Sequence, residues 1–232
     1  MQKKDNFYVI STPIGNLEDI TLRAINTLKS LDILLCEDTR QAQKLLKALN
    51  IENPKLKLLR CDEHTEERIK QKVLDFIKNE KKCGLISDAG TPLVSDPGFR
   101  LLNFLKENEV EIIPIPGPSA FLSALVKSAY PSDKFAFLGF FPRKEGKIKK
   151  LLDKYLPLNI TLIFYESPYR IERTLKILSN ILGEKKIGIC RELTKLHEEF
   201  IEGSPSEILD YLKENNKLKG EFVILIPKEK EK

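Results

Sequence analysis

The sequence predicts an α/β protein built from two α/β domains with mostly parallel or mixed sheets. Short apolar runs typical of buried strands recur along the chain, and amphipathic segments of helical length separate most of them. A length of 232 residues suits two domains of roughly a hundred residues each. Because strands that alternate with helices pair in parallel, we expect the loops after the strands to line a common ligand site.

The expected strands fall into two sets, one in each half of the chain. The first half holds runs at residues 7–12, 31–36, 55–60, 83–87 and 110–115. The second half holds runs at residues 134–140, 160–165, 186–190 and 221–226. Apolar spacing predicts helices at 65–80 and 169–182, and further helices from about Thr21 and from Ser119.

The segment PIPGPSA, residues 114–120, contains three prolines and a glycine. Such a segment ends one strand before the next helix, so we place the domain boundary at about residue 116. The expected domains are an N-terminal α/β domain over 1–116 and a C-terminal α/β domain over 117–227. The charged residues 228–232 are expected to form a disordered basic tail.

The charge balance permits a polyanionic partner without demanding one. The chain has 39 Lys and Arg against 34 Asp and Glu, a net charge of +5, and its basic residues cluster in RKEGKIKK, residues 143–150. A solvated helix face is the alternative explanation of that cluster. The first residues reach Pro13 and Gly15 too soon for a leader or a membrane span, so we expect a cytoplasmic protein without membrane contact.

Cysteine and histidine usage gives no indication of a metal centre. The four cysteines lie far apart, three of them in or beside apolar strand-like runs, which favours reduced core thiols over disulfides or a zinc site. The two histidines, His64 and His197, lie in separate polar contexts. We therefore expect no metal.

Charged residues follow several expected strands. Glu37, Asp38 and Arg40 come after the second strand, where Asp38 or Thr39 could also cap the next helix. In the second half, Glu166 and Arg170 in YESPYR, and Arg191 and Glu192 in RELTK, repeat the pairing of carboxylate and arginine. Structural ion pairs are the alternative explanation of these groups.

The loop SDAGTPLVSDPG, residues 87–98, is of another kind. Its small residues Ala89, Gly90 and Thr91 leave backbone groups accessible, while Pro92 and Pro97 fix two φ angles. Such a loop is suited to bind a ligand with main-chain atoms. Ser119 and Ala120 offer similar free N–H donors at an expected helix start, and a nucleotide-binding glycine motif is absent from the sequence.

The motifs TPIGNLEDIT, EDTR, SDAGTPLVSDPG, PGPSA, FYESPYR, CRELTK and KGEFVILI, taken together and in this order, resemble the tetrapyrrole methylase superfamily. Within it they are similar to a bacterial branch that methylates ribosomal RNA. The resemblance covers nearly the whole chain. It implies a homodimer of two-domain chains that binds S-adenosylmethionine in a cleft between the domains and methylates the 2′-hydroxyl of a cytidine in the decoding region of 16S rRNA.

The resemblance also implies roles for individual residues. The donor-binding positions correspond to Asp88, Ala89, Gly90, Thr91, Val94, Ser119, Ala120, Tyr165 and Leu193. A sulfonium donor is a cation, and the loop has no Lys or Arg before Arg100.

Methyl transfer to a hydroxyl gains from positioning and from removal of its proton, so we expect a carboxylate to act there. Glu166 is our first choice, with Glu37, Asp38 and Glu192 as alternatives. The residues expected to contact RNA, whether as free 16S rRNA or in the small ribosomal subunit, are Arg40, Arg143, Lys144, Arg170 and Arg191.

Two other functions stay open at this point. One is methylation of a tetrapyrrole precursor or another small molecule, as in other members of the superfamily. The other is RNA binding without catalysis, for which the sequence offers no recognised RNA-binding module and no tryptophan.

Overall fold

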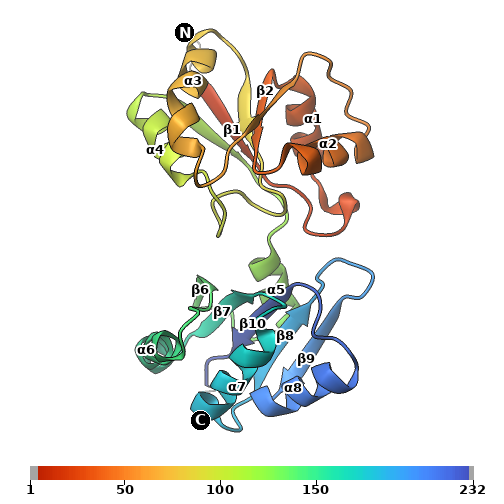
Figure 1. Ribbon diagram of the computed structural model, residues 1–232, viewed down its shortest axis with the longest axis vertical. Coiled ribbons are helices and arrows are strands. Elements are labelled where there is room, and N and C mark those ends of the chain that lie inside the picture. The colour runs from red at the N-terminus through yellow and green to blue at the C-terminus, as the bar shows by residue number, and fades with distance from the viewer. Residues whose placement is uncertain (1–4, 230–232) are drawn as a thin grey trace. The chain divides into compact units, whose positions relative to one another are not determined.

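The computed structural model describes residues 5–229, and the chain divides into two units, Met1–Ser119 and Ala120–Lys232 (Figure 1). The division lies within the proline-rich segment 114–120. The interdomain cleft that the resemblance implies stays a prediction.

The first unit is a doubly wound parallel sheet whose five strands lie in the order β3-β2-β4-β1-β5. Its elements are β1 (Asn6–Ile10), η1 (Leu17–Asp19), α1 (Leu22–Ser30), β2 (Ile33–Cys36), α2 (Thr39–Ala48), β3 (Lys57–Arg60), α3 (Glu66–Lys78), β4 (Cys83–Leu85), α4 (Phe99–Glu107) and β5 (Glu111–Ile115). The strand order reverses at β4 and β1, and in open sheets the loops that follow such strands bind ligands.

Helices cover both faces of this sheet (Figure 1). On one face, α3 and α4 pack through Val73, Leu74 and Leu101. On the other, α1 and α2 pack through Leu28 and Leu46. Each helix therefore buries one apolar stripe against the strands, which fixes the positions of the loops at the sheet edge.

The second unit is a mixed sheet with the strand order β6-β7-β10-β8-β9. Its elements are α5 (Ala120–Ser128), β6 (Phe135–Phe140), α6 (Glu145–Tyr155), η2 (Leu156–Leu158), β7 (Thr161–Glu166), α7 (Ile171–Leu182), β8 (Ile187–Arg191), β9 (Glu199–Gly203), α8 (Pro205–Glu214) and β10 (Phe222–Ile226). Strands β6 and β7 are parallel, whereas β10 is antiparallel to both β7 and β8. Consequently β6, β7 and β8 run in one direction and end at the same edge.

The core of the second unit lies between its sheet and the helices α6, α7 and α8. It contains Ile148 and Leu152 of α6, Leu175 of α7 and Leu212 of α8. Helix α5 packs on the opposite face, where Phe121 stacks on Phe137 of β6. Less of that face is covered, since Phe135 and Phe140 of β6 remain exposed.

The fold class that the sequence predicts is confirmed, with one strand added. Strand β9, with the sequence EFIEG, was not expected because it lacks a continuous apolar run. It pairs with β8 at the sheet edge, where only one side needs a partner.

The start of helix α1 agrees with the sequence, since Thr21 caps it by accepting a hydrogen bond from the Ala24 N–H. The expected tail 228–232 is described only in part. Lys228 pairs with Asp133, the Glu229 N–H donates to Asn159, and residues 230–232 lie outside the described residues.

Candidate functional site

The loop 87–98 starts directly beyond β4 and is joined to the end of β1 by hydrogen bonds. The Thr12 N–H donates to the Gly90 carbonyl at 2.8 Å, and the Gly90 N–H donates to the Thr12 carbonyl at 3.1 Å. The Thr12 hydroxyl also donates to the Ser87 carbonyl at 3.2 Å. Because Thr12 is fully buried, this end of the loop is fixed to the sheet.

A chain of hydroxyl contacts joins three loops of the first unit. Ser11 Oγ and Thr91 Oγ1 lie 2.9 Å apart, and the Thr91 hydroxyl donates to the Pro118 carbonyl at 3.1 Å. Gly117 packs so closely on Ser11 that an added Cβ would lie 2.8 Å from the Ser11 Cβ. The loops after β1, β4 and β5 therefore form one connected edge.

The far end of the loop is held by a buried carboxylate of α3. Glu66 accepts a hydrogen bond from the Gly98 N–H at 2.9 Å, and Arg100 Nε lies 3.7 Å from its other oxygen. Gly98 has a φ of +120°, which other residues rarely adopt. The loop is thus fixed at both ends, to the buried strand β1 and to α3.

Between these ends the backbone adopts unusual conformations. Positive φ angles occur at Gly90, Leu93, Ser95 and Gly98, so four of the twelve residues are left-handed and two of these are not glycine. Non-glycine residues in this region carry a conformational cost and are frequent in ligand-binding loops. The shape of the loop is therefore imposed by its contacts.

A group of carboxylates lies where β2 and β4 end. The Asp88 backbone N–H donates a long hydrogen bond of 3.4 Å to Glu37 Oε1. Burial, with repulsion from Asp96 and Asp88, raises the pKa of Glu37 to about 7. Burial also raises the pKa of Asp96 to about 6. The edge is consequently electronegative and holds one carboxyl that titrates near neutrality.

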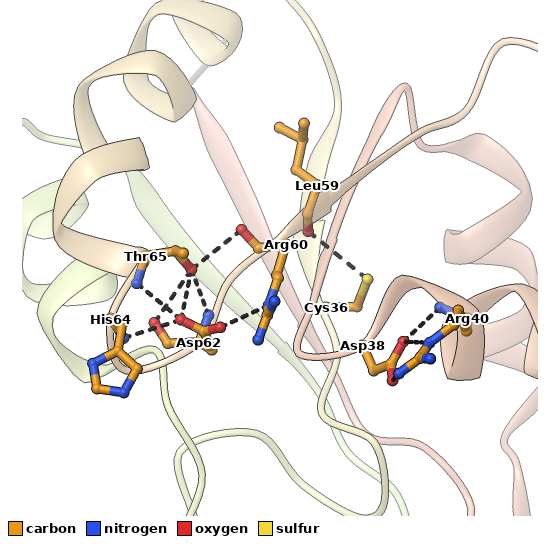
Figure 2. A network of polar contacts seen from close by, with 8 residues as sticks. All are labelled: Cys36, Asp38, Arg40, Leu59, Arg60, Asp62, His64 and Thr65. Carbon is orange, nitrogen blue, oxygen red and sulfur yellow. Dashed lines mark hydrogen bonds and ion pairs between the residues drawn. The ribbon is translucent and has the colours of Figure 1, made fainter.

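Asp38 lies beside that carboxylate group, since its backbone forms a hydrogen bond to the Asp88 carboxyl, but its own carboxyl is engaged by Arg40. Asp38 caps α2 by accepting from the Arg40 N–H, and Arg40 Nη2 lies 2.7 Å from Asp38 Oδ2 (Figure 2). The hydrogen bonds from Arg40 hold the pKa of the half-buried Asp38 carboxyl at about 2. The capping alternative from the sequence is confirmed for Asp38.

The network drawn in Figure 2 also sets the start of α3. Asp62 lies between Arg60, at 2.7 Å, and Thr65, whose hydroxyl and N–H both donate to Asp62 Oδ1 at 2.9 Å. The Glu66 N–H then donates to the Asp62 carbonyl. These contacts place Glu66 at the first turn of the helix, where the helix dipole favours a carboxylate.

In the second unit, Glu166 is buried at the end of β7 and its carboxylate is fully engaged. Arg170 Nη2 lies 2.6 Å from Oε1, the Ser167 N–H donates to the same oxygen at 2.7 Å, and the Thr174 hydroxyl donates to Oε2 at 2.5 Å. These contacts hold the turn from β7 into α7. Glu166 thus forms a structural ion pair with Arg170, which is the alternative explanation of this motif in the sequence.

The segment after β8 is organised by Glu192, which accepts from the Glu221 N–H at 2.9 Å and pairs with Lys195 at 3.1 Å. Despite partial burial, the backbone bond and Lys195 lower the pKa of Glu192. Leu193 beside it is buried. Arg191 pairs with Glu199 at 3.2 Å and lines a pocket of about 320 Å³ with His197 and Lys217.

The remaining residues singled out from the sequence occupy varied settings. Tyr165 packs against Phe137 and Phe140, and Arg143 and Lys144 are exposed after β6. Ser119 and Ala120 lie at the start of α5, while Val94 closes a turn by donating to the Thr91 carbonyl.

Sequence reasoning missed three residues that shape this edge: Thr12, Glu66 and Asp96. Asp96 lies within the loop motif and could have been considered with Asp88. Glu66 lies in an ordinary amphipathic helix, so its sequence context gave no signal.

Residues 5–229 contain neither a metal-binding group nor a membrane-spanning helix. No group of three or more His, Cys, Asp or Glu there could hold a metal ion. No helix in that part of the chain is long and apolar enough to cross a membrane.

Comparison with known proteins places the chain in a family. The family model for Tetrapyrrole (Corrin/Porphyrin) Methylases matches residues 6–209. A protein of a Hydrogenobaculum species called "Ribosomal RNA small subunit methyltransferase I" is 45% identical over 225 residues, covering 96% of this chain and 95% of the relative. The chain belongs to the ribosomal RNA small subunit methyltransferase I family of tetrapyrrole methylases.

Other relatives agree with this assignment. A protein of the same name from Halalkalibacterium halodurans is 42% identical to this methylase, over 96% of this chain and 76% of the relative. The crystal structure of the methyltransferase CobJ superposes with a TM-score of 0.70 at 17% identity, over 97% of this chain and 95% of CobJ. That second likeness shows the shared fold alone. The family membership makes the protein a methyltransferase enzyme.

Proposed function

We propose that this methylase transfers the methyl group of S-adenosylmethionine to the 2′-hydroxyl of a cytidine in the decoding region of 16S rRNA. The observation that carries the proposal is the 45% identity, over nearly both entire chains, to a ribosomal RNA small subunit methyltransferase I. The identity of the nucleoside as cytidine, and of the methylated group as its 2′-hydroxyl, is inferred from the resemblance in motifs. Free 16S rRNA and the small ribosomal subunit are both candidate substrates.

The loop 87–98 suits the donor. Asp88 and Ala89 are exposed at its start, and no Lys or Arg occurs between residues 87 and 98. Bound there, S-adenosylmethionine would supply an electrophilic methyl group carried on a cationic sulfur. The carboxylates of Asp88 and Asp96, joined by Glu37 when it is ionised, offer a favourable potential to such a cation.

We propose that Asp88, Ala89, Gly90, Thr91 and Val94 hold the donor, together with Ser119 and Ala120. The contacts of Thr12 and Glu66 support this, because a loop fixed at both ends loses little entropy when it binds a ligand. Contacts of Tyr165 and Leu193 with the donor stay a prediction.

For the proton acceptor, the contacts of the described residues favour Glu37 over Glu166. A general base works best when its pKa lies near the working pH, and the pKa of Glu37 is about 7. Both oxygens of Glu166 already accept hydrogen bonds from Ser167, Arg170 and Thr174. Asp38, with a pKa of about 2, is a poor base.

On this proposal the residues of the chain have three tasks. The fixed loop orients the donor, Glu37 receives the proton of the attacking hydroxyl, and basic side chains hold the RNA backbone. Arg143 and Lys144 are exposed and suited to phosphate contact, whereas Arg40, Arg170 and Arg191 also serve ion pairs within the protein. We further propose that the enzyme works as a homodimer in the cytoplasm.

The direct test compares three methyl acceptors. The enzyme is incubated with methyl-labelled S-adenosylmethionine and either small ribosomal subunits, free 16S rRNA or a tetrapyrrole precursor. We expect label in the RNA of one or both ribosomal samples. Label in the tetrapyrrole alone would contradict the proposal and support a small-molecule methylase.

A variant tests the loop. Gly90→Arg introduces a long side chain at a φ of +81°, and its Cβ would lie 3.3 Å from Ile14 Cγ2. Donor binding measured by calorimetry should therefore be abolished. Normal donor affinity in this variant would show that the loop does not bind the donor.

A further inference from the structure

Four aromatic side chains form a connected group on the α5 face of the second unit. Phe121 stacks on Phe137 at a centroid distance of 4.6 Å, Phe137 meets Tyr165 at 4.7 Å, and Tyr165 meets Phe140 at 5.6 Å. Phe140, the last residue of β6, is 50% exposed. The Phe140 ring at the end of this group therefore packs against Tyr165 while half of its surface faces solvent.

A guanidinium group lies beside that ring. The Arg170 Cζ is 6.0 Å from the centroid of the Phe140 ring. Its Nη1 donates to the Phe141 carbonyl at 3.0 Å, and its Nη2 lies 2.6 Å from Glu166. Glu166 is buried, so the guanidinium is held in place before any ligand binds.

A second exposed aromatic side chain follows the adjacent strand. Tyr169 is 96% exposed and lies next to Arg170 in the turn from β7 into α7. Strands β6 and β7 are parallel neighbours, so Phe140 and Tyr169 both belong to the carboxyl edge of this sheet.

The chain beyond Phe140 is strongly basic and lacks internal partners. Arg143, Lys144, Lys147, Lys149 and Lys150 are all exposed. Within the described part of the chain, none of them takes part in an ion pair, whereas Arg170, Lys176, Lys185 and Lys213 do. Glu145 is the one acidic residue between 143 and 150.

We propose that Phe140, Tyr169 and the basic segment 143–150 form a docking surface for single-stranded RNA, on which Phe140 stacks an unpaired base and the basic side chains contact phosphates. Bases stack on exposed aromatic rings and on arginine planes, and unpaired lysines attract the backbone. The segment would repel an identical segment of a second copy, so its charge favours RNA. This inference rests on the RNA substrate of the proposed function and names the residues that receive it.

The test measures binding of a fluorescently labelled single-stranded fragment of 16S rRNA to the full chain. Phe140→Ala should raise the Kd of the RNA roughly tenfold, because stacking on one base is lost. Phe140→Trp should restore the affinity, since a larger ring stacks as well. The matched control is Phe135→Ala, which removes a 40% exposed ring from the other end of the same strand and should leave the Kd unchanged.

The basic segment is tested by its salt dependence. Lys149→Glu and Lys150→Glu should each lower the slope of log Kd against log salt by about one, while Lys106→Glu on α4 should not change it. Donor affinity, measured by calorimetry, should stay the same in the lysine variants.

Three results would overturn the inference. The first is an unchanged RNA affinity in Phe140→Ala, and the second is a loss of affinity that Phe140→Trp does not restore. The third is a loss accompanied by a change of oligomeric state in sedimentation, which would assign the surface to self-association. A wild-type enzyme that methylates no RNA would refute the proposed function itself, whereas normal RNA methylation with unchanged binding in Phe140→Ala would refute this inference alone.

Discussion

Burial and the neighbouring carboxylates of Asp96 and Asp88 raise the pKa of Glu37 from its ordinary value of 4.5 to about 7. The carboxyl therefore stays largely protonated up to about pH 7. The protonated form is neutral and needs no counter-charge. A bound cation beside it would favour the charged form and lower this pKa. Donor binding and the ionisation of Glu37 are therefore expected to be linked.

This pKa predicts how Glu37→Gln changes stability with pH. Between 4.5 and about 7 the unfolded chain releases the proton while the folded chain keeps it, so the wild-type protein loses stability as the pH rises through this window. Below the window both states are neutral and nothing is lost. The variant should therefore gain unfolding free energy over the wild type at about pH 8, but not at about pH 4, in urea titrations. An equal difference at both pH values would show that the Glu37 pKa is not raised.

The same group predicts a pH profile for catalysis. If Glu37 accepts the proton, the single-turnover rate should rise with pH and level off above the pKa that Glu37 has with the donor bound, which lies below its value of about 7 without the donor, and Glu37→Gln should lose this dependence along with most of the rate. Glu166→Ala should instead lower the melting temperature, because it leaves Arg170 without its buried partner. A wild-type pH profile in Glu37→Gln would favour Glu166 or Glu192 as the proton acceptor.

Glu66 is predicted to act on the donor through the loop. Glu66→Leu leaves the Gly98 N–H without its acceptor, which costs about 1–3 kcal/mol of unfolding free energy and loosens the loop. The Kd of S-adenosylmethionine should rise at least about tenfold in protein that is still folded, whereas Glu66→Gln keeps an acceptor and should bind normally. The control is Glu67→Leu at the next, exposed position. Equal donor affinity in Glu66→Leu and Glu67→Leu would rule out this role.

At the scale of elements, the loop 87–98 differs from an ordinary turn because other elements impose its backbone. Gly90→Ala and Gly183→Ala both place a Cβ at a positive φ, +81° and +56° respectively. Each should cost about 1–2 kcal/mol of unfolding free energy. Only Gly90→Ala should also weaken donor binding, because Gly183 ends helix α7 with nothing within 4 Å of an added Cβ. Calorimetry on both variants separates backbone strain from loss of the binding loop.

Individual elements also show which features the sequence could predict. The continuous apolar runs of β2 and β10 and the cap of α1 by Thr21 depend on local patterns, so they were predicted. Strand β9 and the Glu66 contact with Gly98 depend on residues distant in sequence, which local patterns do not reveal. The charged motif at Glu166 was found, but only its three partners show that it holds a turn.

At the scale of the whole molecule, each unit has its own hydrophobic cores. Phe7, Leu35 and Leu101 belong to a cluster of the first unit, while Phe164 and Leu175 belong to that of the second. Fragments 1–119 and 120–232 should therefore each fold alone and show cooperative thermal unfolding by circular dichroism. A fragment without a cooperative transition would contradict the assignment of two domains.

The position of the methyl group on the product tests the central claim most directly. Small ribosomal subunits that lack the modification are incubated with the enzyme and labelled S-adenosylmethionine, and the RNA is cut into oligonucleotides. The labelled oligonucleotide is located in the sequence by mass spectrometry and then digested to identify the labelled nucleoside. We predict 2′-O-methylcytidine from the decoding region. Label on a base, on another ribose or on no RNA at all would contradict the proposed reaction.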